Sequence, residues 1–135
     1  IGYPKAQLAE AVQRLDAHPE IAVVHRSSVI ETKPWGKTDQ PDFANMALAV
    51  ETSLKPEDLL DACLEVERAM GRERLERWGP RLIDIDIIAY DRLELRSDRL
   101  TVPHPFAHER DFVLAPLREI DPATAEWVVE RAGRQ

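Results

Sequence analysis

The chain has 135 residues and a mass of 15.4 kDa, which is enough for one domain with its own core. Apolar residues make up 44% and charged residues 32%, as in soluble globular proteins. The 18 basic and 25 acidic residues leave a formal net charge of −7, which argues against a general binder of nucleic acids or acidic membranes. A local basic pocket for a small anion remains compatible with this charge.

We expect a single domain over residues 1–135, a monomer, in the reducing cytoplasm. The longest apolar run covers only residues 46–50, too short for a transmembrane helix, and no segment reads as a signal peptide. Cys63 is the only cysteine, so no disulfide can form within the chain. Its place on the apolar stripe of a predicted helix indicates a core position.

Hydrophobic spacing and the turn-forming residues predict the elements in chain order. We expect a helix over 4–17, a strand over 21–31, a loop over 32–42, a strand over 43–53, a helix over 56–71, a loop over 72–81, a strand over 82–90, a hairpin over 91–101, and short helices over 106–111 and 113–119. A strand before residue 4 would complete the α/β order β-α-β-β-α-β, the ferredoxin-like arrangement with a mostly antiparallel sheet. We expect this first strand to be missing from the chain as given.

The predicted strand over 82–90 carries the strongest chemical signal. Residues two apart in a strand share a face, so Asp84 and Asp86 are expected to point the same way, while Ile85 and Ile87 point into the core. Two adjacent carboxylates repel unless a cation lies between them, and oxygen ligands suit Mg²⁺. The alternative is the solvated face of an edge strand.

An arginine-rich stretch leads into this strand. Residues 68–81 carry five arginines against two glutamates, a net charge of +3 in an acidic protein. A carboxylate pair with Mg²⁺ and a loop of arginines is typical of a polyphosphate clamp. The alternative is a helix end solvated by ion pairs four residues apart, which Gly71, Gly79 and Pro80 disfavour. The arginines are Arg68, Arg72, Arg74, Arg77 and Arg81.

Two further features suggest ligand contacts. The loop before Asn45 could stack a flat heteroaromatic ring on an aromatic side chain while Asn45 pairs with the ring edge; the alternative is an ordinary loop whose aromatics cap the core. His104 and His108 lie four residues apart, but no third histidine or cysteine follows at zinc-site spacing. His104, between two prolines, is instead a candidate hydrogen-bond donor to a ligand.

Residues 77–88 (RWGPRLIDIDII) closely resemble the signature of the 6-hydroxymethyl-7,8-dihydropterin pyrophosphokinase family of folate biosynthesis. Residues 32–45, with DQPDFAN at 39–45, and residues 100–105 (LTVPHP) match the family in the same order, so the resemblance covers nearly the whole chain. It implies the ferredoxin-like fold. It also implies transfer of the β,γ-pyrophosphoryl group of ATP to the pterin hydroxymethyl group, with release of AMP.

The resemblance also implies roles for individual residues. Two Mg²⁺ ions would be held by Asp84 and Asp86, and ATP would be the co-substrate. The implied catalytic residues are Arg72, Arg77, Arg81, Asp84 and Asp86. The implied pterin contacts are Thr32, Pro34, Trp35, Gly36, Phe43, Asn45, Trp78 and Phe112. The implied ATP contacts are Glu67, Arg72, Arg74, Arg77, Arg81, Ile85, Arg99, Thr101, His104 and Arg110.

Two rival functions are weighed against this one. A non-catalytic ferredoxin-like module that senses a nucleotide or a pterin could share the fold and the pockets, but would not need the paired carboxylates of Asp84 and Asp86. A nucleic-acid-binding domain of the RRM type is disfavoured by the net charge of −7 and by the lack of its aromatic motif.

Overall fold

The computed structural model describes residues 4–32, 43–72 and 83–132 of this α/β chain. Within them lie four α-helices, a short 3₁₀ helix and three two-stranded antiparallel sheets. In chain order the elements are α1 (Pro4–Asp16), β1 (Ile21–Arg26), β2 (Ile30–Thr32), β3 (Phe43–Asn45), β4 (Leu48–Thr52), α2 (Pro56–Arg72), β5 (Leu95–Arg96), β6 (Thr101–Val102), η1 (Ala107–Glu109), α3 (Asp111–Ile120) and α4 (Pro122–Ala132).

The two long strands predicted for 21–31 and 43–53 are each broken into two. β1 pairs with β4, and β2 pairs with β3. Between the two ladders, the Ser27 N–H donates to the Ala47 carbonyl at 2.9 Å, and the Ser27 hydroxyl accepts from the Ala47 N–H at 2.8 Å. The prediction of continuous strands was therefore wrong at this point, because a side chain takes the place of a ladder partner and lets the backbone bend.

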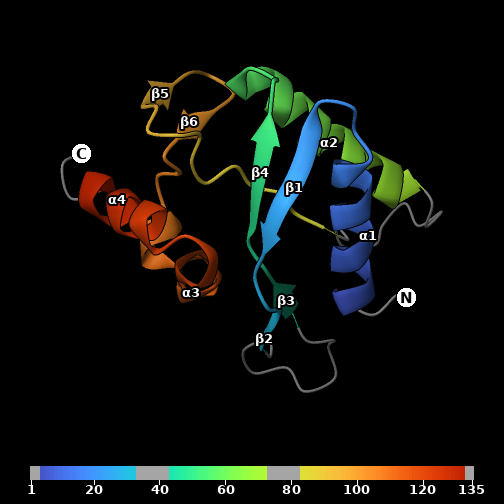
Figure 1. The fold of residues 1–135 in the computed structure, drawn as a ribbon, viewed down its shortest axis with the longest axis horizontal. Helices are drawn as coiled ribbons and strands as arrows, with labels where there is room; N and C mark the ends of the chain where they lie inside the picture. Colours follow the sequence, from blue (N-terminus) through green and yellow to red (C-terminus); the bar gives the residue numbers. More distant parts are fainter. Residues whose placement is uncertain (1–3, 33–42, 73–82, 133–135) are drawn as a thin grey trace.

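The first core lies between the β1–β4 sheet and the two long helices. In Figure 1, β1 and β4 run through the centre, with α1 to their right and α2 across the top. Helix α1 contacts both β1 and α2. This arrangement confirms the predicted helices over 4–17 and 56–71, whose apolar faces are buried here. The buried cluster comprises Leu15, Ile21, Leu59, Ala62 and Cys63.

The segment after residue 82 is not a paired strand, contrary to prediction. None of the ladders among the described residues includes 83–90, although Ile83 is buried and Ile85 and Ile87 pack against the first core. A strand is defined by pairing with a neighbour, whereas here the Ile85 N–H donates to Glu67 on helix α2 and the Ile88 carbonyl accepts from the His104 N–H after β6. The alternation of side chains was predicted correctly, but the ladder was not.

The C-terminal part packs as a second buried group on the other side of the central strands in Figure 1. The predicted hairpin and short helices are present as β5–β6, η1 and α3, and the Val102–Pro103 peptide is cis. Helix α4 was not predicted. Its start is marked by Asp121, whose carboxylate accepts from the Thr124 N–H at 3.0 Å and from the Thr124 hydroxyl at 2.6 Å. Asp followed by Pro122 is a helix-start signal that the sequence analysis overlooked.

No helix in the described part of the chain is both long and apolar enough to cross a membrane.

Candidate functional site

The carboxylate pair lies on the solvent side of the segment after residue 82. Asp84 and Asp86 are exposed, and they alternate with Ile83, Ile85 and Ile87, which turn toward the core. Both carboxylates therefore lie on the solvent-facing side of the segment, as the strand pattern predicted.

The donor set fits Mg²⁺ bound together with a substrate. Among the described residues no group of three or more histidine, cysteine, aspartate or glutamate side chains is placed to hold a metal ion alone. Mg²⁺ commonly uses only one or two protein carboxylates and completes its octahedron with water and phosphate oxygens. Asp84 and Asp86 offer that ligand type, whereas a site for a soft metal would need sulfur or imidazole donors.

Glu67 on α2 holds the backbone between the two aspartates. Its Oε2 accepts the Ile85 N–H at 2.7 Å in a partly buried position. A hydrogen bond to a carboxylate is shorter and stronger than one between neutral groups. The bond joins residues 18 positions apart and fastens the Asp84–Asp86 backbone to the helix. Glu67 was expected as an ATP contact; in this structure its contact is with the protein.

Cys63 lies one turn before Glu67 on the buried side of α2. Burial raises the pKa of its thiol to about 11, and the negative charges of Glu67 and Asp86 add to the effect. The thiol is therefore protonated and inert at neutral pH, and its predicted place in the core is confirmed.

His104 connects the carboxylate segment with the turn after β6. The backbone N–H of His104 donates to the Ile88 carbonyl at 2.8 Å, and the ring Nδ1 accepts the backbone N–H of Phe106 at 3.1 Å. Burial lowers the pKa of His104, and Arg110 lowers it further, while Asp86 opposes the change. The ring is therefore neutral at pH 7, with Nδ1 as acceptor and the proton on Nε2. This leaves Nε2 as a hydrogen-bond donor.

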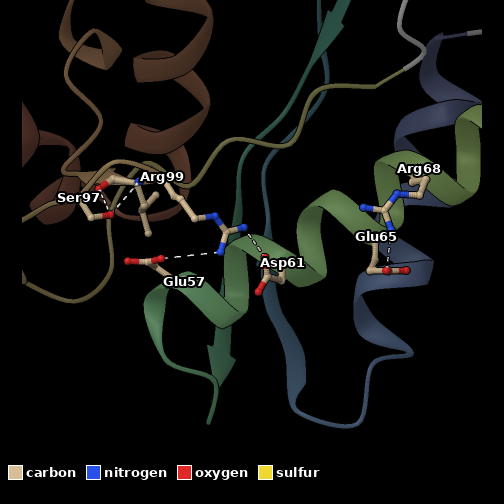
Figure 2. A network of polar contacts seen from close by, with 7 residues as sticks. Glu57, Asp61, Glu65, Arg68, Ser97 and Arg99 are labelled. Carbon is tan, nitrogen blue, oxygen red and sulfur yellow. Dashed lines mark hydrogen bonds and ion pairs between the residues drawn. The ribbon is translucent and has the colours of Figure 1, made fainter.

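Arg99 is bound to the acidic face of α2. Figure 2 shows its guanidinium reached by Asp61 and Glu57 from successive turns of the helix. The Arg99–Glu57 ion pair measures 3.7 Å, and the hydrogen bond that Arg99 donates to Asp61 is the main reason that the pKa of Arg99 is raised. The sequence analysis did not assign these two acids, and no local pattern could reveal them because Asp61 and Arg99 are 38 positions apart.

Two aromatic rings stand exposed on neighbouring elements. Phe43 on β3 is 58% exposed, and Phe112 in the first turn of α3 is 42% exposed. Helix α3 contacts β3, and Asn45, at the other end of β3, is half-buried opposite Ile30. Exposed large apolar side chains on adjacent elements are typical of a binding surface.

Several of the predicted site residues cannot be placed. Of Thr32 and Arg72 only the backbone is described, as the last residues of β2 and α2. The loops predicted over 32–42 and 72–81 lie outside the described residues except for the backbone of Thr32 and Arg72. Seven further predicted site residues also lie outside the described residues. They are Pro34, Trp35, Gly36, Arg74, Arg77, Trp78 and Arg81.

Two hollows in the described surface lie away from the carboxylate pair. One, of about 640 Å³, runs along the outer side of α1, and the other, of about 390 Å³, lies at the start of α2. Glu57, which pairs with Arg99, lines the second. Neither is lined by Asp84 or Asp86, so we locate the candidate site from the side chains and not from these hollows.

The fold and the site together define an α/β protein with an exposed pair of aspartates on a segment that is hydrogen-bonded to helix α2. Residues 1–122 match the family model of 7,8-dihydro-6-hydroxymethylpterin-pyrophosphokinase. Two curated relatives carry the name 2-amino-4-hydroxy-6-hydroxymethyldihydropteridine pyrophosphokinase. The one from Methylorubrum extorquens is 52% identical over 90% of this chain and 77% of its own length, and the one from Bacillus subtilis is 45% identical over 89% and 72%.

A third relative, the bifunctional protein FolKE of Lactococcus lactis subsp. lactis, is 46% identical over 89% of this chain and 34% of its own length. The chain belongs to the 7,8-dihydro-6-hydroxymethylpterin-pyrophosphokinase family. The family and the enzyme class that the motifs predicted, a pyrophosphokinase of folate biosynthesis, are confirmed, and the non-catalytic binding module is not favoured.

Proposed function

We propose that this chain transfers the β,γ-pyrophosphoryl group of ATP to the hydroxymethyl group of 6-hydroxymethyl-7,8-dihydropterin. The hydroxymethyl oxygen loses its proton to solvent and bonds to the β-phosphorus, the bond from that phosphorus to the oxygen bridging it to the α-phosphorus breaks, and that oxygen leaves with AMP. The observation that carries the proposal is the exposed Asp84–Asp86 pair, fastened to α2 through the Ile85 amide, in a chain of this family.

Asp84 and Asp86 hold two Mg²⁺ ions in this proposal. When bound, the ions supply charge neutralisation at the phosphates and make the attacking hydroxyl a better nucleophile. The two carboxylates fix where the cations sit, and the Glu67 contact keeps the backbone between them from moving. Positioning and charge stabilisation are the main needs of phosphoryl-type transfer, so no histidine or glutamate base is required.

The arginines of the stretch that precedes Asp84 contact the phosphates and complete the catalytic set. The proposal rests on their sequence: a run of guanidinium groups provides the planar, charge-assisted bonds that phosphate oxygens accept. The positive charge of these side chains would offset the negative charge of the triphosphate. We assign this role to Arg72, Arg74, Arg77 and Arg81, with Arg72, Arg77 and Arg81 as catalytic residues.

The rest of ATP is proposed to lie along α2 and the β6–η1 turn. His104 supports this because its neutral ring offers an Nε2 donor, and Arg110 lies close enough to lower the pKa of that ring. Arg99 reaches the nucleotide from its seat on Asp61 and Glu57, which orient the guanidinium (Figure 2). The proposed ATP contacts in the described part are Glu67, Ile85, Arg99, Thr101, His104 and Arg110.

The pterin is proposed to stack between Phe43 and Phe112, while Asn45 reads its edge. The exposure of both rings and the contact between α3 and β3 support this placement. An exposed phenylalanine ring that stacks on a flat heteroaromatic ligand removes its apolar face from water. The half-buried side-chain amide of Asn45 supplies hydrogen-bond donors and acceptors for the ring edge. We assign the remaining pterin contacts by the family pattern to Thr32, Pro34, Trp35, Gly36 and Trp78.

We also propose the ferredoxin-like arrangement for the whole domain, because helices α1 and α2 cover a β1–β4 sheet in the expected chain order. Residues 1–135 form one domain in this proposal. We propose a monomer because the exposed rings of Phe43 and Phe112 are accounted for by the pterin and need no second subunit to cover them. A reducing, cytoplasmic setting is supported by the buried free thiol of Cys63.

The test is product analysis with ATP and 6-hydroxymethyl-7,8-dihydropterin, with and without Mg²⁺. We expect AMP and the pterin diphosphate, formed only when both the pterin and Mg²⁺ are present. Release of ADP would contradict the proposal, because it would mean attack at the γ-phosphorus. A folded chain that binds both ligands without turnover would instead support the non-catalytic module.

The metal assignment is tested by Asp86→Asn. We expect kcat to fall at least about a thousandfold, because loss of one of two carboxylate ligands removes most of the charge stabilisation of the transferring group. Asp91→Asn is the matched control: Asp91 is exposed and has a positive φ of 51°, a conformation that asparagine also tolerates. Near-normal turnover of Asp86→Asn would refute the metal role.

A further inference from the structure

A carboxylate on α3 fastens that helix to the bend between β1 and β2. Glu119 Oε2 accepts the backbone N–H of Ser28 at 2.7 Å and the hydroxyl of the same residue at 3.1 Å. The two residues are 91 positions apart in the sequence. Both hydrogen bonds end on an ionised oxygen, which makes them stronger than neutral ones.

The position of Glu119 on its own helix is electrostatically unfavourable. It lies in the last turn of α3, where the unpaired carbonyls carry partial negative charge and a basic residue is favoured. Arg118 satisfies that preference and Glu119 opposes it. The contact with Ser28 offsets this cost, so the acidic residue is explained by what it binds and not by helix stability.

The bend that Glu119 holds leads directly into the hairpin that carries Phe43. Ser28 is two residues before β2, and β2 pairs with β3 in a register that sets Ile30 opposite Asn45 and Thr32 opposite Phe43. Ser27 closes the inner side of the same bend through its two hydrogen bonds to Ala47. The bend is thus held by two contacts, one to the residue just before β4 and one to helix α3.

The helix that Glu119 anchors also carries Phe112. The two residues are seven apart, so they project within about 20° of the same direction and about 10 Å apart along the helix. Fastening Glu119 to Ser28 therefore sets both the rotation of α3 about its axis and its position against β3, which α3 contacts. Phe112 lies on the helix that this contact anchors, and Phe43 lies on β3, which pairs with the strand that follows the anchored bend.

We propose that Glu119 is a positioning residue for the pterin pocket. By binding Ser28 it sets the spacing between the hairpin with Phe43 and the helix with Phe112, so that one flat ring fits between them. The inference rests on the proposed pterin site and adds to it a residue that touches neither substrate. It predicts a selective effect on the pterin, because the proposed ATP contacts, apart from Arg110 at the N-cap of α3, lie on α2, on the carboxylate segment and between Arg99 and His104.

The test compares Michaelis constants for the two substrates in the wild type, Glu119→Ala and Glu119→Gln. We expect Glu119→Ala to raise KM for the pterin about five- to tenfold and to leave KM for ATP within about twofold. Glu119→Gln keeps an oxygen acceptor for Ser28, so its pterin KM is expected within about threefold of the wild type. Glu126→Ala, an exposed glutamate on α4, is the control and is expected to match the wild type.

A second pair of variants covers the case in which Glu119→Ala fails to fold. Ser28→Ala removes only the hydroxyl contact, so it is measured alone and together with Glu119→Gln. Both changes act through one contact. We therefore expect the double variant to raise the pterin KM by less than the product of the two single-variant factors.

Three results would count against the positioning role: an unchanged pterin KM in folded Glu119→Ala, an equal rise in both KM values, and fully independent effects in the double variant. Failure of the proposed function is recognised separately, since it would show as a wild type that makes no AMP from the pterin and ATP.

Discussion

The thiol of Cys63 shows how packing changes the chemistry of a single residue. On sequence alone it is one apolar position among several on a helix stripe. In the structure it is enclosed between α2 and the central sheet, and the nearby charges of Glu67 and Asp86 further disfavour its thiolate. Because the folded-state pKa is raised from 9.0 to about 11, the folded protein holds this proton more tightly than the unfolded chain does.

This shift predicts a specific loss of stability in alkali. Below pH 9 the thiol is protonated in both states and its titration contributes no pH dependence. Between pH 9 and about 11 only the unfolded chain loses the proton, so the free energy of unfolding falls as pH rises, by about 2 kcal/mol. Chemical denaturation of the wild type and Cys63→Ala across this range measures it: the difference in stability between the two is expected to shrink with pH. A constant difference would contradict the prediction.

At the scale of elements, the segment over 83–90 belongs to no ladder among the described residues and is held instead by helix α2 and by the turn after β6. The alternation of aspartate and isoleucine was enough to predict which side chains face the solvent, because it depends only on backbone geometry. The partner of the segment was not predictable in the same way. It depends on Glu67, whose carboxylate captures the Ile85 N–H from 18 positions away.

Loss of the hydrogen bond from the Ile85 N–H to Glu67 is expected to loosen the Asp84–Asp86 pair while both aspartates stay in place as proposed metal ligands. Glu67→Ala leaves the partly buried Ile85 N–H without its acceptor, so we expect kcat to fall at least about tenfold and the Mg²⁺ concentration for half-maximal activity to rise. Glu67→Gln, which keeps an acceptor oxygen, is expected to recover much of the loss. Steady-state kinetics over a Mg²⁺ titration measures both quantities.

The control for this variant is Glu65→Ala on the same helix. Glu65 pairs with Arg68 at 2.8 Å in an exposed surface contact (Figure 2), which contributes little to stability or activity. A Glu67→Ala variant as active as this control, at the same Mg²⁺ dependence, would show that the contact does not support the site.

At the scale of the whole molecule, α4 extends the core beyond the segment that matches the family. The match ends at residue 122, where α4 begins, yet Ala125 and Val128 of this helix are almost completely buried. Helix α4 packs against α3 and η1, and its Trp127 ring is flanked by the guanidinium groups of Arg92 and Arg131 at 5.3 and 5.8 Å. The helix is therefore part of the described core and supports α3 from behind.

Two neighbouring valines test this role. Val128→Ala removes two buried methyl groups and is expected to lower the free energy of unfolding by about 1 to 3 kcal/mol. Val129→Ala makes the same chemical change at a side chain that is 39% exposed, and is expected to cost less than about 0.5 kcal/mol. Urea denaturation of the two variants gives the comparison; equal losses would mean that α4 is not a packed part of the core.

Much of the candidate site could be predicted because its chemistry is contiguous. Asp84, Asp86 and the arginines before them lie within one short stretch, so residue type and spacing already indicate phosphate and Mg²⁺. The contacts that hold this chemistry in place were not predictable: Glu119 on Ser28, and Asp61 on Arg99, join segments 91 and 38 positions apart. Nothing in the local sequence of either partner marks such a pair.

The amino-acid sequence by itself determined the family, the reaction class and the helices α1 and α2, because motifs and amphipathic periods are local properties. The tertiary structure alone decided where the strands break, that a helix residue anchors the backbone of the carboxylate segment, and which acids hold Arg99 and α3. The physical reason is that these outcomes depend on competition between hydrogen-bond acceptors. The Ser27 hydroxyl accepts the Ala47 N–H, and the Glu67 carboxylate accepts the Ile85 N–H, each in place of a carbonyl of a neighbouring strand. Only the folded chain brings these acceptors within reach of the N–H groups.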